Sequence, residues 1–87
     1  MSKYDVTFAI EIAREKSACI LSEYERFFEL NNISTDDAKN PDVSKYWELV
    51  RLSDNLYTAQ TVEEVKETEA TFETARSHIR KALGYDV

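Results

Sequence analysis

The chain has 87 residues, with one each of Gly, Pro, Cys, His, Met and Trp. This length corresponds to one domain over residues 1–87, and a lone glycine excludes glycine-rich phosphate loops and folds built from many hairpins. One cysteine cannot form an internal disulfide, and together with one histidine it cannot build a Cys/His zinc site. The 17 acidic and 11 basic residues leave a net charge of −6, so nucleic acid and anionic membranes are unfavourable partners.

Hydropathy argues against a membrane protein. The longest apolar run covers residues 18–21, far short of the ~20 residues that a membrane span requires. Charged residues occur throughout the first turns of the chain, unlike the beginning of a secretory signal. We therefore expect a cytoplasmic protein in which Cys19 is a free thiol, with no membrane partner.

The first predicted helix covers residues 5–31, where neither Gly nor Pro interrupts a helical repeat. Positions spaced alternately four and three apart form a seam along one side of this helix, as in a heptad pattern. The seam consists of Val6, Ile10, Ala13, Ser17, Ile20, Tyr24 and Phe27. Asn31 and Asn32 are suited to end the helix, because asparagine tolerates the left-handed conformation.

The second predicted helix covers residues 41–59. Asn40 is a favourable N-cap, and Pro41 suits the first helical position because the missing N–H would have no partner there. The apolar residues of this segment cover about half of the helix circumference. We therefore expect the second helix to be sandwiched between the other two and to be the most buried of the three.

The third predicted helix covers residues 62–83. Thr61 and Glu64 form a capping box, in which each side chain accepts a hydrogen bond from the backbone of the other residue. Glutamates lie in the first turns and basic residues in the last, as the helix dipole favours. Gly84 is well placed to terminate the helix.

These segments predict an all-α protein, a three-helix antiparallel bundle with a long first helix. Ser17, Ser53 and Thr68 fall on the apolar seams, and buried hydroxyl groups need hydrogen-bond partners. Bonds between side chains of different helices would satisfy them. Tyrosine hydroxyls on the same faces either share these bonds or reach past the rim to water.

His78 does not fit a metal or phosphotransfer site. Di-iron helical bundles use a Glu-x-x-His motif, but Ala75 stands three residues before this histidine. Phosphotransfer domains place an exposed histidine in mid-helix with a lysine and a glycine close behind it. His78 is followed by Lys81 but by no near glycine, and it lies in the last turns, so a stabilising role at the helix end is favoured.

Cys19 does not fit a catalytic nucleophile. Glu15 and Glu23 lie one turn away on either side, and their carboxylates oppose formation of a thiolate. We therefore predict no catalytic residue, no metal, no cofactor and no enzymatic activity.

Direct recognition of nucleic acid is also disfavoured. The third helix would be the recognition helix of a helix-turn-helix, yet it begins with Glu63, Glu64 and Glu67, which repel phosphates. Rows of carboxylates are compatible with a mimic of nucleic acid. Lys16 and Lys66 interrupt those rows, and a net charge of −6 is modest for mimicry.

A second apolar stripe on the first helix is the feature that points to function. It consists of Phe8, Ile12, Cys19 and Leu30, which project roughly 125° away from the seam. Either the loop near Ile33 or the tail near Tyr85 covers this stripe, or another protein chain does. An exposed apolar strip on a soluble protein is typical of an interaction site. Trp47, at the edge of the second helix's apolar arc, is a candidate second anchor.

We therefore interpret the chain as a small acidic, non-enzymatic helical protein that acts by protein–protein binding. Adaptors, regulators and inhibitors, including those encoded by phages and mobile elements, are of this type. The expected partner is another protein or a second copy of the chain, as in a homo-oligomer. The alternatives are a nucleic-acid mimic that blocks a nucleic-acid-binding protein, and a purely structural oligomerising component.

Overall fold

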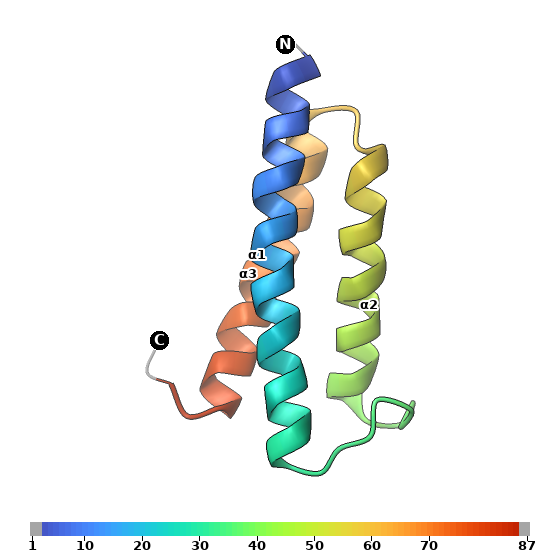
Figure 1. The fold of residues 1–87 in the computed structure, drawn as a ribbon, viewed down its shortest axis with the longest axis vertical. Coiled ribbons are helices and arrows are strands. Elements are labelled where there is room, and N and C mark those ends of the chain that lie inside the picture. Colours follow the sequence, from blue (N-terminus) through green and yellow to red (C-terminus); the bar gives the residue numbers. More distant parts are fainter. Residues whose placement is uncertain (1–2, 86–87) are drawn as a thin grey trace.

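The computed structural model describes residues 3–85 and shows three α-helices, each antiparallel to the next along the chain, so that α1 and α3 run in the same direction (Figure 1). Helix α1 spans Lys3–Leu30, α2 spans Pro41–Asn55 and α3 spans Val62–Ala82. A short 3₁₀ helix, η1, spans Leu56–Thr58, and residues 3–85 contain no strand. The predicted all-α three-helix bundle with a long first helix is confirmed.

Helices α1 and α3 end in the same left-handed motif, once with asparagine and once with glycine. Asn32 has φ 54°, and the amide of Ile33 donates to the carbonyl of Phe28 at 2.8 Å. Gly84 has φ 90°, and the amide of Tyr85 donates to the carbonyl of Arg80 at 2.8 Å. These bonds satisfy carbonyl groups that a helix end otherwise leaves without partners. Both predicted terminators therefore have the expected role.

Side-chain caps define the beginnings of α2 and α3. The Asn40 side chain accepts from the amide of Asp42 at 2.9 Å, with Pro41 at the first helical position. The Thr61 hydroxyl accepts from the amide of Glu64 at 3.2 Å. The Glu64 carboxylate accepts from the amide of Gln60 at 2.9 Å, one residue before the cap, rather than from Thr61 as the capping box predicts.

Helix α2 ends four residues earlier than the sequence suggests. The predicted end at residue 59 is wrong, because the chain tightens into η1 after Asn55 and is extended at Ala59. The Thr58 hydroxyl donates to the carbonyl of Asn55 at 2.8 Å, and the amide of Ala59 donates to Leu56 at 3.1 Å. Local bonds of this kind compete with continuation of the α-helix.

Helix α1 is the central element of the bundle. Both α2 and α3 pack against α1 but scarcely touch each other. The expectation that the second helix is sandwiched is therefore wrong. Its apolar residues are spread over too wide an arc for a single neighbour to cover, so Tyr57 at the end of this segment remains 67% exposed.

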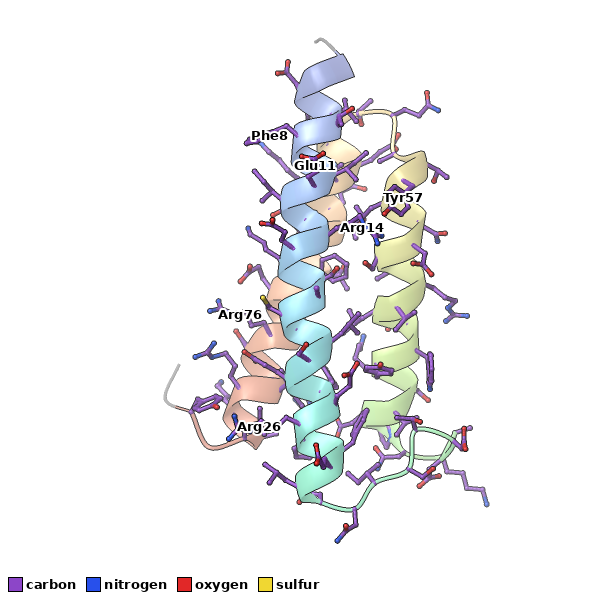
Figure 2. The ribbon with its side chains drawn as sticks, in the orientation of Figure 1. Phe8, Glu11, Arg14, Arg26, Tyr57 and Arg76 are labelled. Carbon is purple, nitrogen blue, oxygen red and sulfur yellow. The ribbon has the colours of Figure 1, made fainter. Side chains whose placement is uncertain are left out.

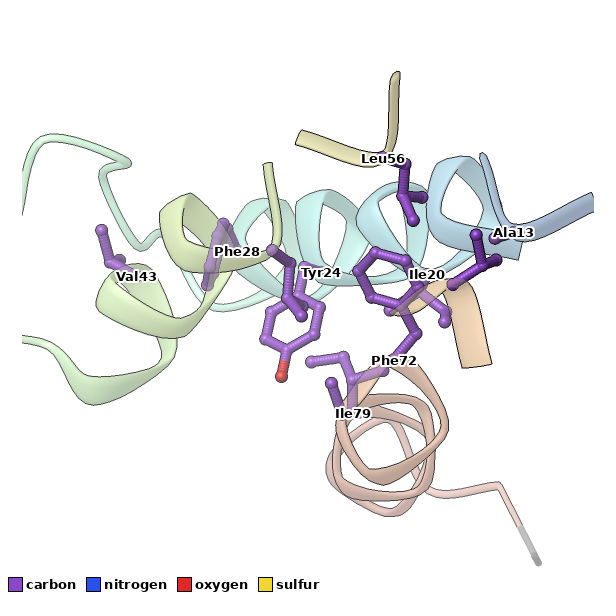
Figure 3. Packing of buried hydrophobic residues seen from close by; sticks show 11 residues of the cluster. Ala13, Ile20, Tyr24, Phe28, Val43, Leu56, Phe72 and Ile79 are labelled. Atoms are coloured by element: carbon purple, nitrogen blue, oxygen red, sulfur yellow. The ribbon is translucent and has the colours of Figure 1, made fainter. Parts of the chain in front are cut away.

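The hydrophobic core follows one side of α1 and combines aliphatic and aromatic side chains (Figure 3). Its buried members are Ala13, Ile20, Tyr24, Phe28, Val43, Leu49, Leu56, Val65, Phe72, Ala75 and Ile79. Full burial of one large apolar side chain contributes about 1.5–3 kcal/mol. Phe28 lies deeper in this core than Phe27, which is only partly buried, so the buried arc leaves the predicted seam at its last turn.

A buried hydrogen bond joins α1 to α2 through the two seam serines. The hydroxyl oxygens of Ser17 and Ser53 lie 2.8 Å apart. The Ser17 hydroxyl also donates to the carbonyl of Arg14 at 2.8 Å, so its single proton is used there and Ser53 is the donor between the serines. The expected bond between buried hydroxyl groups is confirmed for this pair. It is not found for Thr68, whose hydroxyl donates to the carbonyl of Glu64 within α3 at 3.3 Å.

We predict that Thr61→Ala destabilises the fold by about 1 kcal/mol, because an amide in the first turn of α3 loses its acceptor. Urea unfolding followed by circular dichroism measures the effect. Thr74→Ala is the matched control, since Thr74 is exposed in the interior of the same helix and its removal should not lower stability. Equal midpoints for Thr61→Ala and the parent chain would contradict the cap.

We predict an energetic coupling between Ser17 and Ser53. Either serine-to-alanine substitution alone removes their shared hydrogen bond, so the double variant should lose less stability than the sum of the two single losses. Urea unfolding of the four proteins gives the coupling, expected to be about 1 kcal/mol. Strictly additive losses would show that the 2.8 Å contact contributes nothing.

Candidate functional site

The candidate stripe lies exposed along α1. Phe8 and Leu30 are both 64% exposed, Ile12 is 37% exposed, and Cys19 is an exposed free thiol. With 100° per residue, these four side chains fall within about 40° of arc. We call this set the α1 face. Its members are therefore aligned along a single line on a long, regular helix.

Neither the loop near Ile33 nor the segment near Tyr85 buries the α1 face within residues 3–85. Ile33 packs against the core, and Tyr85 lies beneath the guanidinium of Arg80, 5.0 Å from ring centroid to carbon. Phe8 and Leu30 remain largely open. The folded chain itself therefore gives these side chains little protection from water.

Basic side chains accompany the α1 face in this acidic protein. Arg26 falls in the same arc, and Figure 2 shows it projecting from the same side of α1 as Phe8. Arg76 of α3 extends to this side as well, and it lines a hollow next to Cys19. Carboxylates lie there too, since Glu23 and Glu73 line the same hollow and Glu73 pairs with Arg76 at 3.6 Å. The surface thus mixes apolar contact area with charged groups of both signs, among which arginine is enriched in protein–protein interfaces.

Trp47 belongs to a different part of the structure. It is 47% exposed on α2, and its indole N–H donates to the carbonyl of Thr35 at 2.9 Å. Its ring also meets Tyr46 edge-on at 5.0 Å between centroids. Trp47 therefore fastens the loop before α2, a role that the sequence alone did not reveal.

A stacked pair between α1 and η1 was also absent from the sequence-based expectations. The Arg14 guanidinium lies 4.0 Å above the ring centroid of Tyr57 and donates to the carbonyl of Ser53 at 2.7 Å (Figure 2). The pair holds an exposed aromatic ring in a defined position. Spacing along the chain gives no signal for it, because the partners are far apart in sequence.

His78 makes a tertiary contact instead of completing a reactive site. Its Nε2 lies 2.9 Å from a carboxylate oxygen of Asp42, which links α3 to the first turn of α2. Within the part of the chain that the structure describes, no group of three or more His, Cys, Asp or Glu residues is arranged to hold a metal ion. The same part includes no helix long and apolar enough to cross a membrane.

Two tyrosines in the core between α1 and α2 have perturbed ionisation. Burial raises the pKa of Tyr24 to about 12, with further contributions from the charges of Asp42 and Glu48. Burial also raises the pKa of Tyr46 to about 12, helped by the hydrogen bond that its hydroxyl donates to Glu25 at 2.8 Å. Both phenols are therefore kept protonated more strongly than in an unfolded chain.

Comparison with protein families identifies the family of the chain. The sequence matches the model for bacterial epsilon antitoxin over residues 2–82, which is nearly the whole chain. The chain belongs to the bacterial epsilon antitoxin family. Searches of curated proteins and of solved structures give no significant match.

Membership in the antitoxin family agrees with the function class inferred from composition. An epsilon antitoxin is a small protein that inhibits a toxin by binding it, not an enzyme. The expectation of a non-enzymatic inhibitor with a protein partner is supported at this level. The surface through which the antitoxin binds is a separate question, for which the α1 face is the leading candidate.

We predict that the fold loses stability as the pH rises above about 10. The unfolded phenols lose their protons near pH 10, whereas Tyr24 and Tyr46 retain theirs in the folded chain up to about 12. The contribution of these two raised pKa values to the free energy of unfolding is therefore full below pH 10, and it is lost as the pH rises toward 12. Urea midpoints measured across this range should fall less steeply in a Tyr24→Phe, Tyr46→Phe double variant. An equally steep fall would assign the effect to other groups.

Proposed function

We propose that the antitoxin binds its toxin through the α1 face, with Phe8, Ile12 and Leu30 as the main apolar contacts and Cys19 between them. The main observation behind this proposal is that four apolar side chains lie along one line on the central helix and are exposed in the folded chain. Membership in the antitoxin family indicates that the partner is a protein toxin. Inhibition then follows from covering part of the toxin surface rather than from chemistry.

The energetics are sufficient for a specific complex. Burying Phe8, Ile12 and Leu30 would contribute about 1.5–3 kcal/mol each before the cost of association. The 28 residues of α1 would span about 42 Å, so the contacts are distributed along an extended surface. Arg26, in the same arc, adds charge-assisted donors for carbonyl or carboxylate groups of the toxin.

Trp47 is a candidate second anchor in this proposal. About half of the residue is exposed, and tryptophan is enriched among the residues that dominate binding energy. Its bond to Thr35 and its contact with Tyr46 hold the ring in place, so little conformational freedom would be lost on binding. It lies on α2 and would widen the interface beyond α1.

The deciding experiment is the double substitution Ile12→Asp with Leu30→Asp. Two carboxylates in the interface would have to be buried without partners, so toxin binding should fall at least a hundredfold, by roughly 3 kcal/mol or more. Isothermal titration calorimetry with the cognate toxin measures the affinity. Circular dichroism should show an unchanged helical fold, because neither side chain belongs to the core.

The matched control is Thr7→Asp with Ala18→Asp. Both residues are exposed on α1, about 100° or more around the helix from the α1 face, and receive the same added charge. The control should bind the toxin normally. Equal loss in both variants would point to net charge, and unfolding of the first variant would return Ile12 and Leu30 to the core.

Salt dependence separates this interface from mimicry of nucleic acid. Binding through apolar contacts should change little as salt rises, whereas binding through rows of carboxylates should weaken steeply. Sedimentation of the chain alone tests the remaining alternative. If the Asp substitutions abolish self-association but leave toxin binding intact, the α1 face joins two copies of the antitoxin instead.

A further inference from the structure

A cavity of about 480 Å³ lies between the first turn of α2 and the middle of α3, where these two helices scarcely touch. Pro41 and Ala75 contribute apolar wall, and Asp42, Thr74 and His78 contribute polar groups. Tyr24 of α1 lines the same cavity. The core arc of α1 therefore supplies one wall, on the side of the helix away from the α1 face.

The Tyr24 hydroxyl is the unusual member of this cavity. Tyr24 is 0% exposed, and its hydroxyl oxygen is buried without a hydrogen-bond partner. Figure 3 shows the hydroxyl directed away from α1, beyond the core side chains that surround the ring. The neighbouring Tyr46 differs, since its hydroxyl is bonded to Glu25. A buried hydroxyl without a partner destabilises a fold. Phenylalanine at this position would avoid that cost, so the presence of tyrosine needs an explanation.

The charges around the cavity favour a cation. Asp42 lines it, and Asp42 and Glu48 are the two charges that act with burial on the pKa of Tyr24. Lys45 also lines the cavity, but its ammonium is paired with Glu48 at 2.8 Å. His78 lines it as well, and its Nε2 lies 2.9 Å from Oδ1 of Asp42, so a ligand would bond to the second carboxylate oxygen of Asp42. The chain as a whole carries a net charge of −6. An anion would therefore meet an unfavourable field at the hydroxyl, whereas a cationic N–H donor would meet a favourable one.

We propose that this cavity is a binding site for a small organic cation of the guanidinium class. A guanidinium offers five N–H donors and no acceptor, which suits a site with the oxygens of Tyr24, Asp42 and Thr74. Thr74 already donates its proton to the carbonyl of Ala70 at 3.1 Å, so toward a ligand it acts as an acceptor. A short alkyl stem would pack on Pro41 and Ala75. The site is independent of toxin binding at the α1 face.

The test uses the whole chain and a matched pair of probes, butylguanidinium and butylurea. They have nearly the same shape, but only the first is charged. In nuclear magnetic resonance titrations at constant ionic strength, butylguanidinium should move the signals of Tyr24, Thr74 and His78, with a dissociation constant of about 1 mM. Butylurea should not. Equal responses to the two probes would overturn the proposal.

Two tyrosine variants assign the binding to the hydroxyl. Tyr24→Phe should weaken butylguanidinium binding about tenfold, as expected for loss of a hydrogen bond to a charged group. The same substitution should raise the urea midpoint of the free chain, because an unpaired buried hydroxyl is removed. Tyr46→Phe removes a hydroxyl whose bond lies elsewhere and should leave probe affinity unchanged. Unchanged affinity in Tyr24→Phe, or a lower midpoint, would overturn the proposal.

Toxin binding distinguishes a free cation from an arginine side chain of a protein partner. If the site takes a free small cation, Tyr24→Phe should bind the toxin as well as the parent chain does. A tenfold loss of toxin affinity in this variant would overturn the assignment to a free ligand. It would indicate instead that an arginine of the toxin enters the cavity.

Discussion

The structure depends on one helix, α1, that packs against both of the others. Because α2 and α3 each pack on α1 and scarcely on each other, the side of α1 that faces them must be broad. Small residues such as Ala13 and Ser17 let the neighbouring helices approach, and the large rings of Tyr24 and Phe28 fill the wider part of the bundle. Four of the eleven buried core residues lie on α1 and four on α3, with fewer on α2 and η1. The two larger helix–helix interfaces both involve α1, so this helix holds the bundle together.

This arrangement gives α1 two different sides. The core side ends at the cavity between α2 and α3, where an open helix–helix interface leaves the Tyr24 hydroxyl without a partner. The opposite side carries Phe8 and Leu30, which no third neighbour covers among residues 3–85. A ligand in the cavity and a protein on the α1 face would thus act on the same helix without competing for space. Any coupling between them would pass through the packing of α1 itself.

The sequence was most informative where the determining interaction is local. Asn40 with Pro41, Thr61 with Glu64, and Gly84 each mark a helix end because the groups that they satisfy lie within a few residues. The α1 face was also accessible, because helical periodicity alone separates it from the seam. Which helices pack against one another was not accessible from the sequence. Periodicity shows which residues of α2 are apolar, but how many neighbours cover them depends on where α3 lies, so the expected sandwich was wrong. Contacts such as His78 with Asp42 join distant segments, and no spacing rule predicts them.

An exposed phenylalanine and a buried hydroxyl without a partner are informative for the same physical reason. Each lowers the stability of the isolated chain relative to an obvious substitute, a polar residue at Phe8 or a phenylalanine at Tyr24. The capped helix ends and the Ser17–Ser53 bond show that the same chain satisfies polar groups at other places. Glu23 Oε2 and Arg80 Nε are also buried without a partner, but Glu23 Oε1 and the Arg80 Nη1 group pair with each other at 3.4 Å, whereas Tyr24 has no other polar side-chain atom. Features that the folded monomer does not explain are best explained by something that it binds. For an antitoxin, the first such feature has a natural partner in the toxin, since an inhibitor that does no chemistry must act through surface that it covers. The second lies on the other side of α1 from the α1 face, where we propose a separate ligand.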